Sequence, residues 1–256
     1  MESDSLLLLD VTDEVAVLTL NRPDARNALS PELIAVLQQT CAECDGRDDV
    51  SVMVLTGADP AFCGGIDLKR LAAGTSGARE LIGDGPFPPH RKPIIGAING
   101  ATVTGGLELA LACDFLIASE RARFADTHAR VGVLPGWGLT IELPAAIGLR
   151  RAKQMSLTDN YIDAPTALAW GLVNEVVPHE LLLARAREIA LDVASIRSAC
   201  VQAVRSLYDE VADQVGEQAR DLEMRRSREW MRDQFDRTRL ATDRDEIVRR
   251  GRSQLS

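Results

Sequence analysis

The chain has 256 residues, of which 46% are hydrophobic and 26% are charged, as is typical of a soluble globular protein with a sizeable core. A formal net charge of −9 argues against a nucleic-acid partner, because no basic excess is available to neutralise phosphates. The N-terminus lacks the basic segment of a signal peptide, and the apolar run at residues 6–9 is too short to span a membrane. We therefore expect a cytoplasmic protein.

The first two-thirds of the chain alternates short apolar segments with amphipathic ones. Residues 15–20 alternate in polarity and run into the loop 21–23, which predicts a strand. Ser-Pro-Glu at residues 30–32 predicts a helix start, and the helix is expected to reach about Cys44. Further strands, covered on both faces, are expected at residues 50–55, 93–98 and 115–118.

The last third differs, because from about Pro178 onward the pattern predicts only helices. Charged residues dominate residues 218–252, which is compatible with a solvated helix face carrying i,i+4 ion pairs. Bulky side chains nevertheless recur there and indicate burial against another surface, such as a second subunit. These bulky residues are Leu222, Met224, Trp230, Met231 and Phe235.

The chain has five cysteines, and Cys41 and Cys44 have the spacing of a zinc or redox pair. No second pair or histidine cluster completes a tetrahedral site, and the two cysteines lie at helical spacing. We expect free thiols and no metal site.

The first glycine-containing segment of chemical interest covers residues 56–69. It follows a predicted buried strand, contains Gly57, Gly64 and Gly65, and places Asp67 to cap a short helix. Paired glycines let the backbone approach a ligand and leave amide N–H groups free to bind it. A tight strand-to-helix turn without a ligand explains the same pattern.

A second segment, residues 99–114, predicts a strand, a turn of small residues and an almost wholly apolar helix from about Gly105. The unpaired N–H groups at such a helix start favour developing negative charge. Glu108 is the only charged residue between Lys92 and Asp114. The helix dipole could explain it, but its apolar neighbours make a buried carboxylate costly, which favours a catalytic role.

A third segment, residues 124–138, combines the titratable Asp126 and His128 with a Pro-Gly turn and an aromatic residue. A single histidine is more often structural than catalytic. This segment therefore indicates a function only together with the other two.

Together and in this order, the segments resemble the crotonase (enoyl-CoA hydratase/isomerase) superfamily. The resemblance rests on five ordered motifs, at residues 20–29, 61–69, 105–108, 131–136 and 167–177. It implies an α/β fold built as a spiral of ββα turns over residues 1–195. It also implies a C-terminal helical region, residues 196–256, that mediates assembly into a homotrimer or homohexamer.

The resemblance also assigns roles to individual residues. Backbone amides of Ile66 and Gly105 would form an oxyanion hole for an acyl-CoA thioester, and Glu108 would be the first catalytic glutamate. Coenzyme A would enter as part of the substrate, with no separate cofactor. The residues implied to contact it are Asp24, Ala25, Arg26, Gly65, Ile66, Asp67, Leu68, Lys69 and Gly105.

The sequence departs from the family pattern at the second catalytic position, where His128 stands in place of a glutamate. Hydration could use Glu108 with His128 as acid, with an ionisation near that of imidazole. Asp126, two residues earlier, could instead supply the second carboxylate. A single carboxylate could also support isomerisation, and a non-catalytic acyl-CoA binder is the third alternative. The acyl preference is expected to depend on residues 72–89.

Overall fold

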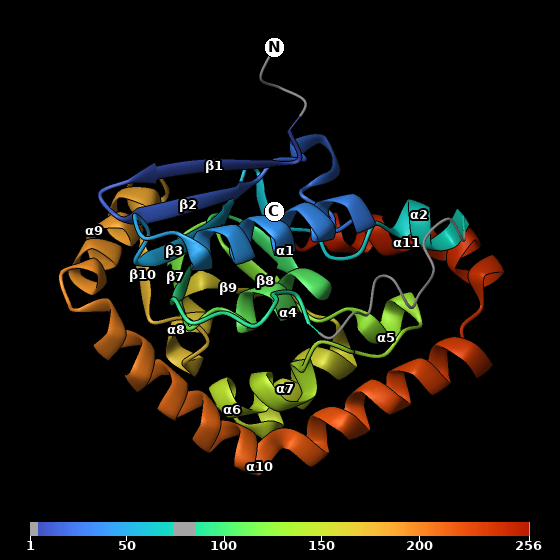
Figure 1. Cartoon of the computed structure of the whole chain (residues 1–256). Helices are drawn as coiled ribbons and strands as arrows, with labels where there is room; N and C mark the ends of the chain where they lie inside the picture. The colour runs from blue at the N-terminus through green and yellow to red at the C-terminus, as the bar shows by residue number, and fades with distance from the viewer. Residues whose placement is uncertain (1–4, 74–84, 256) are drawn as a thin grey trace.

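Two β-sheets and the helices that surround them form the protein in the computed structural model, which describes residues 5–73 and 85–255 (Figure 1). Among these residues, the larger sheet has the strand order β1-β2-β3-β5-β7-β10 and the smaller one β4-β6-β8-β9. β1 is antiparallel to β2, and the other neighbours in the larger sheet are parallel. The larger sheet contains β1 (Leu7–Thr12), β2 (Val15–Leu20), β3 (Val52–Gly57), β5 (Ile94–Ile98), β7 (Phe115–Ser119) and β10 (Glu175–Val177).

The smaller sheet explains why the chain winds as a spiral. After β3, β5 and β7, the chain enters a short strand of the smaller sheet and then a helix. These strands are β4 (Ala61–Cys63), β6 (Ala101–Val103) and β8 (Arg123–Ala125), completed by β9 (Ile162–Asp163), and the helices are α2 (Leu68–Ala73), α4 (Gly105–Leu111) and α5 (His128–Val131). Three successive ββα units confirm the fold class predicted from the sequence.

The predicted strands and the first helix are confirmed with small shifts at their ends. α1 covers Pro31–Gly46, and the Ser30 hydroxyl accepts a hydrogen bond from the Leu33 N–H at 3.3 Å. Cys41 and Cys44 are buried, unpaired thiols of this helix, and burial raises the pKa of Cys41 to about 12.

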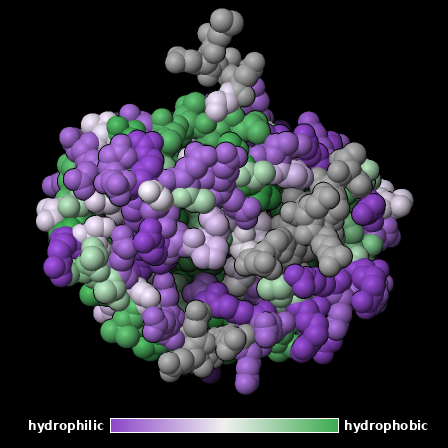
Figure 2. Space-filling view, in the orientation of Figure 1, coloured by the Kyte–Doolittle hydropathy of each residue, from purple (hydrophilic) through white to green (hydrophobic). Residues whose placement is uncertain are grey.

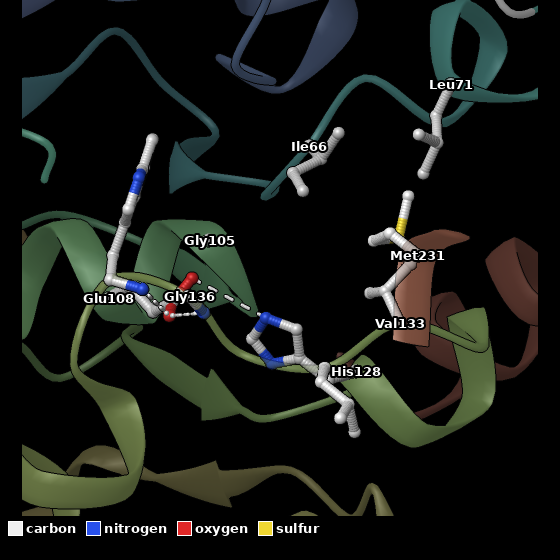
Figure 3. Close-up of a pocket in the computed structure, with 10 residues that line it drawn as sticks. Ile66, Leu71, Gly105, Glu108, His128, Val133, Gly136 and Met231 are labelled. Atoms are coloured by element: carbon white, nitrogen blue, oxygen red, sulfur yellow. Dashed lines mark hydrogen bonds and ion pairs between the residues drawn. The ribbon is translucent and has the colours of Figure 1, made fainter. Parts of the chain in front are cut away.

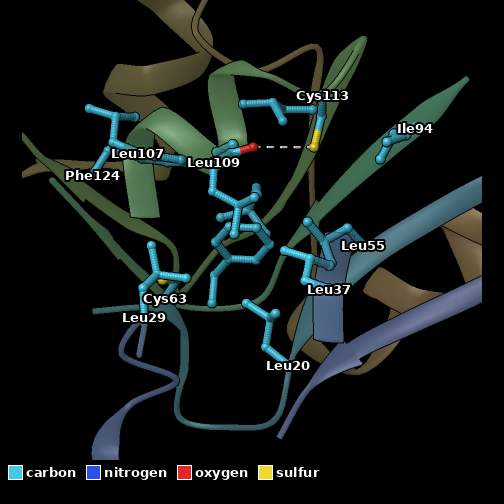
Figure 4. Close-up of a cluster of buried hydrophobic side chains, with 14 of the residues drawn as sticks. Leu20, Leu29, Leu37, Leu55, Cys63, Ile94, Leu107, Leu109, Cys113 and Phe124 are labelled. Atoms are coloured by element: carbon cyan, nitrogen blue, oxygen red, sulfur yellow. Dashed lines mark hydrogen bonds between the residues drawn. The ribbon is translucent and has the colours of Figure 1, made fainter. Parts of the chain in front are cut away.

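Alternate residues of β3 enter two different cores. Met53 and Leu55 join a large hydrophobic cluster with residues of both sheets, part of which Figure 4 shows. Val52 and Val54 face the other way, against α9 (Leu182–Ala194). Burial on both faces is the reason for the nearly continuous apolar sequence of this strand.

The remaining helices are α6 (Leu139–Ile147), α7 (Leu149–Thr158), α8 (Ala164–Trp170), α10 (Ser198–Asp233) and α11 (Arg237–Ser253), with the short 3-10 helices η1 (Pro23–Ala25) and η2 (His179–Leu181). Of these, α8 contacts β8, β9 and β10, whereas α6, α7, α10 and α11 pack chiefly against other helices. Figure 1 shows α10 passing along the side of the molecule opposite β1, beneath α6 and α7. No helix within the described ranges is long and apolar enough to cross a membrane.

The C-terminal helices pack against their own chain. α10 contacts α6, and α11 returns to contact α2 and α5. Met231 and Phe235 pack against the main core, so their bulk is explained without a second subunit, while Leu222 and Trp230 stay exposed. The predicted boundary after residue 195 falls between α9 and α10, and the division into two regions stays a prediction.

Candidate active site

A small cavity of about 30 Å³ brings together residues from separate parts of the chain (Figure 3). Its volume is sufficient for a water molecule, which needs roughly 10–15 Å³. Four of its lining residues are the catalytic candidates predicted from the sequence. The cavity is lined by Ile66, Leu71, Gly105, Glu108, His128, Val133, Leu134, Gly136, Trp137 and Met231.

The backbone N–H groups of Ile66 and Gly105, two residues that line this cavity, have neither a backbone nor a side-chain acceptor among the described residues. Gly105 is the first residue of α4, where helical N–H groups lack a partner within the helix. Ile66 is flanked by Gly65, whose carbonyl accepts from Leu29 N, and Asp67, whose N–H donates to Leu29 O. Because both neighbours bond to Leu29, the Ile66 N–H is directed to the opposite side.

The two N–H groups belong to neighbouring segments. A Cβ atom built on Gly105 would lie 3.7 Å from the Ile66 nitrogen and 3.5 Å from its Cγ1. Glycine at position 105 therefore leaves open the space beside the Ile66 amide. Paired backbone donors beside a helix N-terminus are suited to stabilise negative charge that develops on a ligand.

The residue before the helix has a constrained backbone. Thr104 has a φ of 55°, which β-branched residues seldom adopt. Its N–H donates to Ala125 O at 2.9 Å, and its hydroxyl lies 2.6 Å from that of Thr127. These bonds tie the start of α4 to the end of β8 and so fix the direction of the Gly105 N–H.

Glu108 is buried, and both of its carboxylate oxygens have partners. Oε1 accepts hydrogen bonds from the N–H groups of Gly136 at 3.1 Å and Trp137 at 2.9 Å. Oε2 lies 3.5 Å from Nε2 of His128, which Figure 3 shows on the facing side of the site. The Pro-Gly turn thus orients the carboxylate toward the imidazole.

His128 connects this carboxylate to a second one. Nδ1 of its ring lies 2.6 Å from Oδ1 of Asp126, and all three side chains are nearly inaccessible to solvent. Asp126 does not line the cavity, so it lies behind the imidazole and not in place of it. The structure therefore favours His128 over Asp126 as the group that faces Glu108.

The two carboxylates control the charge of His128. Burial alone would lower the pKa of His128, but the negative charges and hydrogen bonds of Glu108 and Asp126 outweigh it and raise the pKa to about 10. Burial would raise the pKa of Asp126, but the hydrogen bond to His128 lowers it overall. The sequence leads us to expect a pKa for His128 near that of free imidazole. In the structure, the pKa of His128 lies above the range that is usual for histidine.

A larger groove of about 820 Å³ adjoins the cavity, and Ile66 lines both. Most of the predicted coenzyme A contacts lie in its lining: Asp24, Ala25, Arg26, Ile66, Asp67, Leu68 and Lys69. Arg22 holds these segments together, because it donates to Ala28 O and forms an ion pair with Asp67 at 3.1 Å. Asp67 also caps α2, as predicted, by accepting from Arg70 N at 3.4 Å.

The two other predicted contact residues lie elsewhere. Gly105 lines the small cavity, whereas Gly65 lines neither space. Gly65 has a φ of +86°, and a Cβ atom there would lie 2.7 Å from Val103 O. Its role is therefore to permit the close turn before Ile66.

Several site residues were not predicted from the sequence. Leu71 and Met231 form an apolar part of the cavity wall. Trp137 also lines it, and its buried Nε1 has no hydrogen-bond partner within residues 5–73 and 85–255. The opposite wall of the groove comes from α11 and includes Arg244, Arg249, Arg250 and Arg252. Trp137 lay within the third segment singled out from the sequence, residues 124–138. Nothing in a charged helix, by contrast, indicates which residue will reach a cavity. Much of the stretch 72–89, expected to set acyl preference, lies outside the described residues.

Comparisons with known proteins find sequences similar to this chain. The chain matches the sequence model of the Enoyl-CoA hydratase/isomerase family over residues 10–238. It is 44% identical to an (E)-benzylidenesuccinyl-CoA hydratase of Thauera aromatica, over 77% of this chain and 79% of the relative. It is 39% identical to a probable peroxisomal enoyl-CoA hydratase of Arabidopsis thaliana, over 77% and 75% of the two chains.

Solved structures show the same likeness. A crystal structure of an enoyl-CoA hydratase from Mycobacterium smegmatis is 47% identical, with a TM-score of 0.83 over 90% of this chain and 99% of that one. A monofunctional enoyl-CoA isomerase from M. smegmatis is 31% identical, with a TM-score of 0.69 over 81% and 94%.

Proposed function

Because the chain belongs to the enoyl-CoA hydratase/isomerase family, we propose that it adds water to the double bond of a 2-enoyl-CoA thioester. The observation that carries this proposal is the position of Glu108 and His128 at one cavity with the free amides of Ile66 and Gly105. That cavity provides an oxyanion hole, an acid–base pair and room for a water molecule.

The two amides act on the thioester carbonyl. As water attacks the β-carbon, negative charge develops on the carbonyl oxygen, and the N–H groups of Ile66 and Gly105 donate to it. Preorganised donors of this kind stabilise the transition state, and loss of one typically costs about 10²–10³ in rate.

Glu108 and His128 divide the proton transfers. Glu108 accepts a proton from the water whose oxygen bonds to the β-carbon, and protonated His128 donates its Nε2 proton to the α-carbon. The proton on Glu108 then returns to His128, whose Nε2 lies 3.5 Å from Oε2. One water is consumed, and both side chains regain their starting state. A pKa of about 10 keeps His128 in its donating form near neutral pH.

The groove suits the coenzyme A part of the substrate. The η1 loop, the start of α2 and the arginines of α11 enclose it, and cationic side chains bind phosphate groups well. Because Ile66 belongs to both spaces, a ligand in the groove can extend its acyl end into the cavity. We propose coenzyme A as part of the substrate, no separate cofactor, and a cytoplasmic location.

Isomerisation is the second candidate, supported by the likeness to the M. smegmatis isomerase. Glu108 could move a proton between carbons without consuming water. Incubation with crotonyl-CoA and with a 3-enoyl-CoA separates the two reactions, by following the absorbance of the conjugated thioester. Loss of absorbance from crotonyl-CoA supports hydration. Gain of absorbance from the 3-enoyl-CoA, with no loss from crotonyl-CoA, would replace hydration by isomerisation.

We also propose that the protein assembles as a homotrimer or a dimer of trimers. An exposed apolar stripe on α10 supports this, because Val204, Leu207, Tyr208 and Val211 recur at helical spacing and are each more than half exposed. Figure 2 shows hydrophobic surface over β1 and along the edge where Figure 1 places the first half of α10. Sedimentation of a monomer at micromolar concentration would contradict this proposal.

A further inference from the structure

One face of α10 contacts the segment that carries the catalytic turn, residues 132–142. Four α10 side chains at successive spacings of three, four and three residues reach it, so they lie on one side of the helix. Arg220 donates to Glu142, and Glu223 accepts from the N–H groups of Gly138 and Thr140. Ser227 donates to the carbonyl oxygen of Leu134, and Trp230 donates to that of Gly132.

The strongest of these contacts comes from Glu223, whose side chain is largely buried. Oε1 accepts from Gly138 N at 2.6 Å, and Oε2 accepts from Thr140 N at 2.7 Å and from the Thr140 hydroxyl. The carboxylate thus caps the start of α6, where N–H groups lack helical partners and negative charge is favoured. Hydrogen bonds to a charged acceptor are stronger than neutral ones.

The same turn is held from its other side by Glu108. Glu108 accepts from the N–H groups of Gly136 and Trp137, and Glu223 accepts from that of Gly138. Three consecutive backbone N–H groups are therefore divided between two buried carboxylates from different helices. A shift of the turn changes both bonds to Glu108 Oε1, and hence the direction of Oε2 toward His128.

We propose that Glu223 is a positioning residue for Glu108, and that α10 fixes the catalytic turn through it. The proposal rests on the proposed function, since it concerns the orientation of the same carboxylate. A glutamate in a charged helix ordinarily remains in water, and burying it is costly unless its charge is matched. The buried charge of Glu223 is compensated by the backbone N–H groups of Gly138 and Thr140, next to the catalytic site.

Glu223→Ala and Glu223→Gln test this proposal in the full-length enzyme. The alanine variant removes both acceptors, so kcat for crotonyl-CoA should fall by roughly 10- to 100-fold, since small displacements of catalytic groups cost about that much. KM should change less than about threefold, because the groove is untouched. The glutamine variant keeps one acceptor and should recover part of the lost kcat.

Arg205→Ala is the matched control on the same helix. Arg205 also anchors α10, through Asp114 at 2.7 Å and His90 O at 3.0 Å, but lines neither the cavity nor the groove. It should lower the melting temperature without changing kcat. An equal loss of kcat in this control would overturn the proposal, because any loosening of α10 would then suffice.

Hydrogen exchange provides a readout that does not depend on the reaction. Peptides covering residues 132–142 should exchange faster in both Glu223 variants than in the wild type or in Arg205→Ala. Turnover of crotonyl-CoA by the wild type tests the proposed hydration separately. Unchanged exchange and full kcat in Glu223→Gln would overturn the positioning role, even if Glu223→Ala failed to fold.

Discussion

The two walls of the candidate active-site cavity are built in different ways. One wall presents the backbone amides of Ile66 and Gly105, and its shape depends on contacts that a glycine permits at short range. The other wall belongs to the segment at residues 132–138, which α10 side chains hold from 85 to 98 residues farther along the chain. The first wall is therefore built within the ββα core, whereas the second exists only once the C-terminal helices have packed.

The largest expected effect comes from blocking the first wall. In Gly105→Val, a Cβ atom would lie 3.3 Å from Leu29 Cδ1 and the γ-methyl groups would enter the space beside the Ile66 amide. Turnover of crotonyl-CoA should fall by about 10²–10³, with the melting temperature little changed. Wild-type turnover in this variant would show that the oxyanion hole lies elsewhere.

A neighbouring glycine provides the contrast. In Gly106→Ala, the new Cβ would lie 2.2 Å from the carbonyl oxygen of Cys63, which is backbone and has little freedom to move. This variant should fail to fold or should unfold at a much lower temperature. Circular dichroism and melting curves for the two variants test this difference. Gly105→Val should stay folded, because Gly105 leaves space for the ligand, whereas Gly106→Ala should not, because Gly106 is required for packing.

Glu108→Gln should have the next largest effect. Glutamine keeps an acceptor for the N–H groups of Gly136 and Trp137, so the turn stays in place, but it removes the base. We expect kcat to fall by about 10² or more. Single-turnover rates on crotonyl-CoA, compared with melting temperatures, measure the loss, and full activity would exclude Glu108 as the acid–base group.

Variants of Asp126 and His128 test whether His128 donates the proton while Asp126 only raises the pKa of His128. His128→Ala should lower kcat by a factor similar to that for Glu108→Gln. Asp126→Asn removes a charge that raises the pKa of His128, so the alkaline limb of the kcat profile should move from about 10 toward neutral pH. An unmoved limb in Asp126→Asn would mean that His128 does not supply the proton.

The same pair should make stability depend on pH. Because folding raises the pKa of His128 to about 10, its stabilising contribution is complete below the unfolded value of about 6.5 and is lost as the pH rises through about 10. The difference in unfolding free energy between the wild type and His128→Gln should therefore shrink from pH 6 to pH 10.5. Urea titrations at each pH measure it, and a constant difference would contradict the raised pKa.

The smallest effect on turnover should come from the outer face of α10. Leu207→Lys with Tyr208→Lys places two charges on the exposed stripe, so sedimentation should shift from oligomer to monomer. The rate per active site should change little, because these residues lie in neither cavity lining. Ser206→Lys, on the exposed polar part of the same helix, is the matched control.

Much of the fold could be predicted from the sequence because its signals are local. Ser30 and Asp67 cap helices through hydrogen bonds within three residues, and β3 alternates between two cores with the period of a strand. The assignment of Glu108 followed from a single charge in an apolar helix. His128 could be placed by motif, but its partners could not, since they depend on a ring direction that sequence does not give.

The sequence by itself determined the main strands, the first helix, the two glycine turns and the buried glutamate, because each depends on backbone conformation or burial within a few residues. The ββα order followed from the resemblance of the ordered motifs to a family. Only the tertiary structure decided that Asp126 lies behind His128, that Met231 and the α11 arginines reach the two cavities, and that Glu223 holds the catalytic turn. These contacts join residues far apart in the chain. A charged helix has the same local pattern whether its glutamates are in water or in the protein, so packing alone selects the one that is buried.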